Sequence, residues 1–310
     1  MSEADVTPAP RRSVLSTSRG THAGAFTPLD WALFGSIGLI WGSSFLLIAI
    51  GLDAFTPGLV TWMRVGCGAI ALWLVPGART PVAREDRPRL VALSVLWVAI
   101  PFTLFPLAEQ WISSALTGLL NGSLPIFATA IGALMLRRAP GRAQTAGLAV
   151  GFVGIAAIAV PAATVGANDA LGVSLVLIAV VCYGIAINIA APVTQRYGSL
   201  PVMARMLALA AVWTAPLGLV GVTRSSFAWP SFAAVAVLGA VGTGLAFVLM
   251  GRLVARVGSA RASFATYLIP VVAMILGAVF RDDVITAIAV AGIALVIAGA
   301  ILASRRETSR

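Results

Sequence analysis

The stretch WALFGSIGLIWGSSFLLIAIG, residues 31–51, has no charged side chain and is long enough to cross a membrane as one α-helix. An α-helix rises about 1.5 Å per residue, so about 20 residues span the ~30 Å hydrocarbon core of a bilayer. Nine further apolar stretches follow it, at 58–75, 90–108, 113–136, 143–160, 171–193, 200–222, 231–250, 259–280 and 284–303. They lack the period-two alternation of barrel strands, which leaves helices as the structure that satisfies the backbone in lipid. The sequence therefore predicts an all-α integral membrane protein with ten transmembrane helices.

The composition supports a membrane protein and excludes several other classes. Hydrophobic residues make up 59% and charged residues 10% of the 310 residues, and the mean hydropathy is +0.99. A soluble domain has about 45–50% apolar and about 25% charged residues, which excludes a soluble enzyme and a disordered chain. The net charge of +10 comes from 21 basic residues, all of them arginine, and 11 acidic ones. Most of these arginines lie in short loops between apolar stretches, so they indicate the topology of the chain in a membrane. We therefore expect the chain to contact a lipid bilayer and not a nucleic acid.

The distribution of the arginines predicts the orientation of the chain. In a ten-helix topology, 17 of the 21 arginines fall on the side of the N-terminus, and only Arg224 and Arg281 fall in loops on the other side. Positively charged residues are enriched in cytoplasmic segments of membrane proteins. We therefore expect both termini to be cytoplasmic, with a disordered tail at 1–28, rich in Ser, Thr, Pro and Arg, and a short C-terminal tail at 304–310.

An internal repeat divides the chain into two halves. Ser114-Ala115, Pro125, Gly147 and Gly154 recur 145 positions later as Ser259-Ala260, Pro270, Gly292 and Gly299, and Trp41-Gly42 and Arg64 are echoed 142 and 141 positions later by Tyr183-Gly184 and Arg205. The repeats cover 31–160 and 171–303, with five predicted helices in each. Because five is odd, the two halves insert with opposite orientation. Inverted repeats are typical of secondary transporters that work by alternating access.

The repeated residues also carry a family resemblance. The motifs are Ile40-Trp41-Gly42-Ser43-Ser44-Phe45 followed by Arg64, Ser114-Ala115-Leu116 followed by Leu124-Pro125-Ile126-Phe127, and Gly258-Ser259-Ala260-Arg261-Ala262-Ser263 followed by Tyr267-Leu268-Ile269-Pro270-Val271-Val272. In order, spacing and duplication they resemble two consecutive EamA domains of the drug/metabolite transporter superfamily. The resemblance implies a ten-helix inner-membrane carrier. Many members of that family export amino acids or other small metabolites.

The chain departs from the family pattern at one position. Members usually end the fourth helix of each repeat in a Gly-Glu pair, an acid about 13 residues after the proline. Here Arg138 takes that place in the first half, whereas Asp283 keeps an acid in the second. A role that this acid has in other members is therefore not expected in the first half of this chain.

Three charged residues are candidates for transport. Arg64 and Arg205 lie well inside predicted helices, where a charge is costly and normally faces a cavity or a partner. Either could bind a substrate carboxylate or phosphate, or could extend its side chain to the membrane interface. Glu109, at the outer end of the third predicted helix, could pair with Arg64 or carry a coupling proton. Alternatively, Glu109 is a solvated acid in the loop after this helix.

Uncharged residues complete the candidate site. Trp41 and Tyr183 lie in the middle of their predicted helices, away from the interfaces where aromatic residues usually anchor, so we expect them to line a substrate pocket. Asn121, Asn188 and Tyr267 are polar groups within the hydrocarbon that could bind substrate or hydrogen-bond neighbouring helices.

Two prolines are candidates for gating. Pro125 and Pro270 lie inside predicted helices, where each removes a backbone hydrogen bond and bends the helix. Bends or local breaks of this kind line transporter cavities, and prolines also form purely structural kinks.

These features favour a secondary transporter of a small organic metabolite such as an amino acid. Among secondary transporters, they favour an exporter. The alternatives are a membrane-embedded enzyme acting on lipid head groups, a structural or channel protein, and a transporter of phosphorylated or nucleotide-linked sugars. The sequence has no Walker loop, HExxH, GxSxG or CxxC motif, so it predicts no enzyme activity, catalytic residue, metal site or cofactor. It makes no prediction about the oligomeric state.

Overall fold

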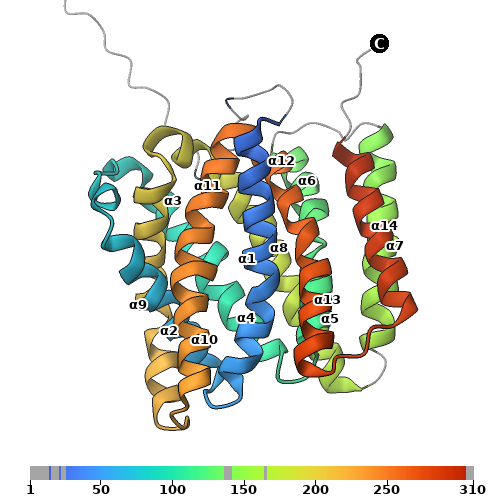
Figure 1. The fold of residues 1–310 in the computed structure, drawn as a ribbon. Coiled ribbons are helices and arrows are strands. Elements are labelled where there is room, and N and C mark those ends of the chain that lie inside the picture. The colour runs from blue at the N-terminus through green and yellow to red at the C-terminus, as the bar shows by residue number, and fades with distance from the viewer. Residues whose placement is uncertain (1–13, 15–20, 22–25, 136–141, 164–165, 305–310) are drawn as a thin grey trace, which may run out of the picture.

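The structure of the chain, a computed structural model, describes residues 14, 21, 26–135, 142–163 and 166–304 (Figure 1). Within these residues every regular element is a helix, which confirms the predicted all-α fold class. The predicted tail 1–28 lies outside the described residues except for Val14, Thr21 and residues 26–28. Arg138 and residues 305–310 of the predicted C-terminal tail also lie outside them.

The helical elements divide at residues 164–165 into two series of similar order. The first series is α1 (Pro28–Leu52), α2 (Pro57–Trp73), η1 (Pro76–Arg79), η2 (Arg84–Asp86), α3 (Arg87–Leu93), η3 (Ser94–Ala99), α4 (Ile100–Ala108), α5 (Ser114–Asn121), α6 (Leu124–Met135) and α7 (Arg142–Ala163). The second series is α8 (Ala167–Tyr197), α9 (Ser199–Val222), α10 (Trp229–Gly239), η4 (Ala240–Leu245), α11 (Ala246–Val257), α12 (Ser259–Ser263), η5 (Phe264–Tyr267), α13 (Leu268–Arg281) and α14 (Ala287–Ser304). In both series the third long stretch contains a π-helical segment, η3 or η4.

Seven helical stretches of the described chain are long and apolar enough to cross a membrane. They are Pro28–Leu52, Arg84–Ala108, Ser114–Met135, Ala167–Tyr197, Ser199–Val222, Trp229–Val257 and Arg261–Arg281. Two shorter apolar stretches lie within α7 and α14, and α2 has 17 residues. These helices are those of a multi-pass membrane protein, and the ten-helix topology stays a prediction.

Helix boundaries follow from capping residues in the sequence. Thr27 and Asp30 form a reciprocal capping box at the start of α1: the Thr27 backbone N–H donates to Asp30 Oδ2 over 2.9 Å, and the Asp30 N–H donates to Thr27 Oγ1 over 3.3 Å. Pro28 and Pro57 occupy the first turns of α1 and α2, where the missing N–H costs nothing.

The two helices that the sequence predicts around Pro125 and Pro270 are interrupted near these prolines, where bends or local breaks were expected. The α-helix α5 ends at Asn121, and α6 begins at Leu124 beside Pro125. In the second series, the 3-10 segment η5 precedes α13, whose third residue is Pro270. A proline lacks the backbone N–H that would continue the hydrogen-bond ladder of the preceding turn, which explains interruption at these positions.

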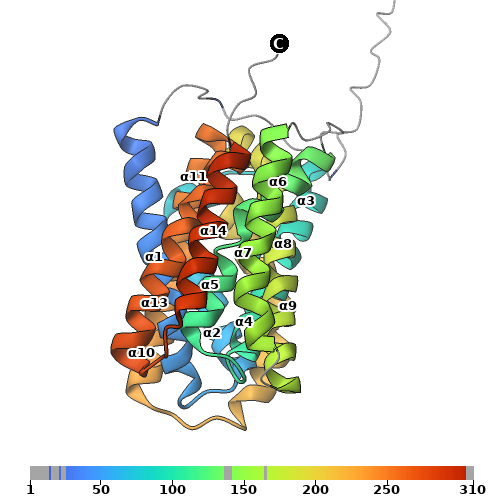
Figure 2. The ribbon, with the colours of Figure 1, turned by 90° about the vertical axis from the view of Figure 1, so that its right-hand side faces the viewer.

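Helices of the first series pack on helices of the second throughout the bundle. Contacts join α2 to α9, α7 to α14, α1 to α13 and α6 to α8. Figures 1 and 2 show α7 and α14 side by side, and in Figure 1 this pair forms one edge of the molecule. The start of α1 and the end of α14 lie at the same end of the bundle (Figure 1).

Four ion-pair contacts between described residues of the two series lie at the two ends of the bundle, and their acids belong to the first series. The pairs are Arg256 with Asp30 (2.6 Å) and Arg196 with Glu85 (2.6 Å) and Asp86 (2.9 Å) at the end where α1 begins, and Arg281 with Asp53 (2.9 Å) at the opposite end. The two ends of the interface between the series are therefore held by charges.

Glycines allow α7 and α14 to approach closely. A Cβ atom on Gly299 of α14 would lie 2.6 Å from the carbonyl oxygen of Gly147, and one on Gly154 of α7 would lie 2.7 Å from the carbonyl oxygen of Gly292. These contacts are with backbone, which cannot rotate away. Small residues at such crossings are a common means of packing helices in membranes.

Replacement of Gly299 by alanine is therefore expected to destabilise the protein by about 1–3 kcal/mol, the usual cost of overpacking. Gly35→Ala is the matched control, because nothing lies within 4 Å of its added Cβ and alanine favours the helix. Thermal unfolding of the detergent-purified variants measures the difference. Equal unfolding temperatures for the two variants would show that the α7–α14 contact is not tightly packed.

Candidate functional site

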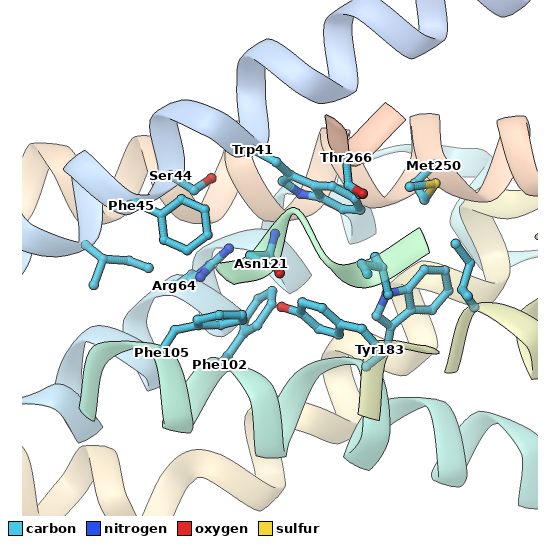
Figure 3. Close-up of a pocket in the computed structure, with 14 residues that line it drawn as sticks. Trp41, Ser44, Phe45, Arg64, Phe102, Phe105, Asn121, Tyr183, Met250 and Thr266 are labelled. Atoms are coloured by element: carbon cyan, nitrogen blue, oxygen red, sulfur yellow. The ribbon is translucent and has the colours of Figure 1, made fainter. Parts of the chain in front are cut away.

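A cavity lies in the middle of the bundle, between helices of both series (Figure 3). The first series contributes α1, α2, η3, α4, α5 and α6, and the second contributes α8, η5 and α11. The cavity is narrow in this conformation, with a volume of about 30 Å³ open to water. A solute larger than a few waters must therefore displace side chains or helices to enter.

Arg64 of α2 provides a positive charge in this cavity. The residue is 4% exposed, its Nε donates a hydrogen bond to Thr243 Oγ1 over 2.8 Å, and its Cζ lies 3.6 Å from the ring centroid of Phe102. Among the described residues, its two Nη groups have no hydrogen-bond partner and no ion pair. Figure 3 shows the guanidinium directed towards the space beside Asn121. This free edge can bind a carboxylate by two parallel hydrogen bonds.

Asn121 and Tyr183 place polar atoms in the same space. Asn121 is the last residue of α5, so the interruption before α6 brings its side chain to the cavity, and Figure 3 shows Tyr183 with its hydroxyl directed there as well. The Asn121 Oδ1 is buried without a hydrogen-bond partner in the described part of the chain. An unsatisfied buried acceptor is costly, and a ligand that donates a hydrogen bond would satisfy it.

Aromatic rings form much of the cavity wall. Trp41 contacts Phe247 edge-on at 5.7 Å, and Phe105 contacts both Phe45 and Tyr183 at 5.6 Å between ring centroids. The indole Nε1 of Trp41 donates to the carbonyl oxygen of Gly242 over 3.0 Å, which fixes the orientation of the ring. The wall offers apolar surface, and its ring faces can also attract a cation.

Four of the seven predicted substrate-binding residues therefore lie together, namely Trp41, Arg64, Asn121 and Tyr183. The other three do not line this cavity.

The Asn188 amide is fully engaged between helices: its Nδ2 donates to the carbonyls of Ala128 (2.9 Å) and Gly184 (2.8 Å), and its Oδ1 accepts from Ser259 Oγ at 3.0 Å. Tyr267 is 8% exposed and stacks on Phe264, and its hydroxyl has no partner among the described residues.

Arg205, the repeat equivalent of Arg64, occupies a different environment. Its guanidinium donates to the carbonyl oxygens of Ala78 (2.8 Å), Arg79 (3.3 Å) and Pro201 (3.0 Å) and lies over the ring of Trp73 at 5.7 Å. These contacts attach α9 to η1 at the end of the bundle where α1 begins.

Glu109 and the two prolines lie near the cavity without lining it. Glu109 follows the last residue of α4, and both of its carboxylate oxygens are buried with no hydrogen-bond partner in the described structure. It forms no ion pair with Arg64 at 4.0 Å or less. Pro125 follows the residue Leu124, which lines the cavity, and Pro270 lies in the turn after η5, which carries the lining residue Thr266.

Further residues line the cavity or hold its side chains without being among the predicted site residues. Trp97, Phe102 and Phe105 lie inside a predicted helix, so the reasoning applied to Trp41 would have found them. Thr243, which holds Arg64, has no such signal, because a neutral threonine between two glycines is unremarkable in an apolar helix.

The comparison with known families agrees with this architecture. The sequence profile of the EamA-like transporter family matches residues 31–160 and 170–305, which together make up most of the chain. The chain belongs to the EamA-like transporter family. This membership makes the protein a membrane transporter of small molecules and not an enzyme, as the sequence predicted.

Curated relatives cover nearly the whole chain. A "probable terminal-alkyne amino-acid exporter" of Streptantibioticus cattleyicolor is 30% identical over 286 residues, covering 90% of this chain and 94% of its own. An "uncharacterized transporter" of Archaeoglobus fulgidus is 21% identical over 279 residues, covering 89% of this chain and 99% of its own. A solved crystal structure with 18% sequence identity covers 89% of this chain and 96% of its own at a TM-score of 0.62, a similarity that concerns the fold alone.

Proposed function

We propose that this transporter exports amino acids with apolar side chains, or closely related small zwitterions. The observation that carries the proposal is the Arg64 guanidinium, which lies in a cavity of mainly aromatic and aliphatic side chains with its Nη groups unpaired among the described residues. The relative from Streptantibioticus cattleyicolor, named for amino-acid export, supports the same substrate class.

Each part of an amino acid has a chemical counterpart in the cavity. Its carboxylate would bind the free edge of Arg64, and its ammonium would donate to the unpaired Asn121 Oδ1 and face the aromatic rings. Its side chain would contact Ile48, Ile187 and Met250. Arg64 is the sole basic side chain among the lining residues. A phosphorylated sugar carries more negative charge than this arrangement neutralises, so it fits the cavity less well.

The proposed mechanism is alternating access between two inverted five-helix repeats, 31–160 and 171–303, with ten transmembrane helices in all. The two matches to the family profile support this division, as do the cross-series helix contacts and the ion pairs at both ends of the bundle. In such a mechanism the charges at one end separate while those at the other stay paired. The arginine distribution supports cytoplasmic termini in an inner membrane.

Transport by purified protein in liposomes tests the proposal. Proteoliposomes preloaded with a labelled L-amino acid are diluted into label-free buffer, and efflux is compared with that of empty liposomes across a panel that includes L-propargylglycine, a terminal-alkyne amino acid, and L-norvaline, its saturated counterpart. Their carboxamides, which lack the anionic group, serve as matched controls. We expect efflux of the amino acids and none of the amides. Equal efflux of acids and amides, or efflux no faster than from empty liposomes, would refute the proposal.

We further propose that Glu109 carries a coupling proton, because its buried carboxylate has no hydrogen-bond partner in the described structure and lies at the end of a cavity-lining helix. Glu109→Gln keeps the shape of the protonated acid but cannot release a proton. Export driven by an imposed pH gradient is therefore expected to lose its dependence on that gradient in this variant, while exchange of labelled for unlabelled substrate continues. An unchanged response to the pH gradient would exclude Glu109 from coupling.

A further inference from the structure

We propose that Thr243 is a positioning residue for substrate recognition: it fixes the Arg64 guanidinium so that the Nη edge faces the substrate carboxylate. The inference rests on the proposed function, because it assigns Arg64 to a carboxylate. It concerns a residue of the second series that does not itself line the cavity.

The hydrogen bonds of the Thr243 hydroxyl define its orientation. The hydroxyl donates to the carbonyl oxygen of Leu238 over 3.0 Å and accepts from Arg64 Nε over 2.8 Å, and the residue is fully buried. Because its single hydrogen is directed at Leu238, a lone pair remains for Arg64. The bond occupies Nε, and the edge formed by the two Nη groups stays free for a ligand.

Thr243 belongs to an irregular segment that also holds a second cavity residue. It lies in the π-helical segment η4, whose Gly242 carbonyl oxygen accepts the hydrogen bond from Trp41 Nε1 at 3.0 Å. One turn of the second series therefore orients two cavity side chains of the first, Arg64 and Trp41. Single π-helical turns of this kind are frequent at functional sites.

Close backbone packing holds the junction of α10 and η4 against α2. A Cβ atom on Gly239 would lie 2.6 Å from the carbonyl oxygen of Arg64 itself, and one on Gly68 would lie 2.9 Å from that of Gly239. Only glycine permits this approach of the two helices. The Thr243 hydroxyl is thus presented to Arg64 by backbone, with little freedom to move away.

The equivalent segment of the first series provides a matched control. In η3, Ser94 accepts a hydrogen bond from Trp213 Nε1 at 3.0 Å, so a side-chain N–H of α9 bonds a hydroxyl of a π-helical turn. Trp213 is 49% exposed and lies outside the cavity. Ser94→Ala removes a bond of the same type without affecting Arg64.

Without the hydroxyl, Arg64 loses the one hydrogen bond it makes to a described residue and keeps its contact with the face of the Phe102 ring, about which the guanidinium can turn. Thr243→Val, of nearly the same shape, should therefore raise the KM for L-norvaline efflux about tenfold and change Vmax less than about twofold; tenfold corresponds to about 1.4 kcal/mol. Thr243→Ser should restore the KM, and Ser94→Ala should leave it within about twofold of wild type.

A second measurement tests the hydrogen bond between Arg64 Nε and Thr243 Oγ1 without any substrate. In protein labelled with 15N at arginine Nε, the signal of the Arg64 Nε–H group can be assigned by its loss in Arg64→Lys. The hydrogen of this group should exchange slowly with water in the wild type and in Thr243→Ser, but rapidly in Thr243→Val. Unchanged exchange in Thr243→Val would overturn the proposal, as would altered exchange with a wild-type KM. If the wild-type protein transports no amino acid, the proposed function fails, and the exchange rates still establish whether Thr243 holds Arg64.

Discussion

Arg64→Ala is expected to abolish amino-acid efflux from proteoliposomes while leaving the protein folded. The guanidinium lies in the cavity with its Nη groups unpaired in the described chain, so its removal deprives a bound carboxylate of its counter-charge. Loss of one partner from a buried charge pair typically costs about 3–5 kcal/mol. Because about 1.4 kcal/mol corresponds to a factor of ten, the apparent affinity should fall more than about 100-fold.

The lysine variant distinguishes recognition from simple charge. Arg64→Lys keeps the positive charge but loses the planar fork and the Nε bond to Thr243, so we expect efflux to be restored only in part. Arg205→Ala is the informative comparison, because it removes the repeat-equivalent arginine, which bonds backbone carbonyls outside the cavity. It should lower the unfolding temperature and leave the KM of the folded fraction unchanged. Full efflux by Arg64→Ala at matched protein levels would refute the assignment of Arg64.

Arg64 and Arg205 also show how far sequence reasoning could go. Both lie inside apolar stretches at equivalent repeat positions, so the sequence treats them alike: each could face a cavity or a partner, or extend its side chain to the membrane interface. Their partners differ because η1 offers free carbonyl oxygens to Arg205, whereas η4 offers the Thr243 hydroxyl to Arg64. Such partners come from segments far away in the chain, and no local pattern indicates them.

The apolar stretches predicted the all-α fold class because length and hydropathy alone determine which segments suit a bilayer. They could not predict which face of each helix points inwards, since these helices are apolar on nearly all sides. Asn121 and Asn188 illustrate this: the first lines the cavity, while the second bonds neighbouring helices. The sequence indicated a bend or a local break at Pro125, but not that it would bring Asn121 to the cavity.

A large loss of stability is expected when the ion pair between α1 and α11 is broken. Arg256 Nε donates to Asp30 Oδ1 over 2.6 Å, and the two side chains differ in exposure: that of Asp30 is 0% exposed and that of Arg256 is 34% exposed. Arg256→Met should therefore destabilise the protein by about 3–5 kcal/mol, because it leaves a buried carboxylate with only its bonds to Thr27.

Asp30→Asn should cost much less, although it breaks the same pair. Asparagine keeps an oxygen that can accept from Thr27 in the capping box, and the remaining arginine is exposed enough to be hydrated. The double variant Asp30→Asn/Arg256→Met should then be more stable than Arg256→Met alone, since it no longer buries an unpaired charge. Thermal unfolding of the three purified variants measures this coupling directly. Additive losses in the double variant would mean that the pair contributes little and that α1 and α11 are held at this end by packing alone.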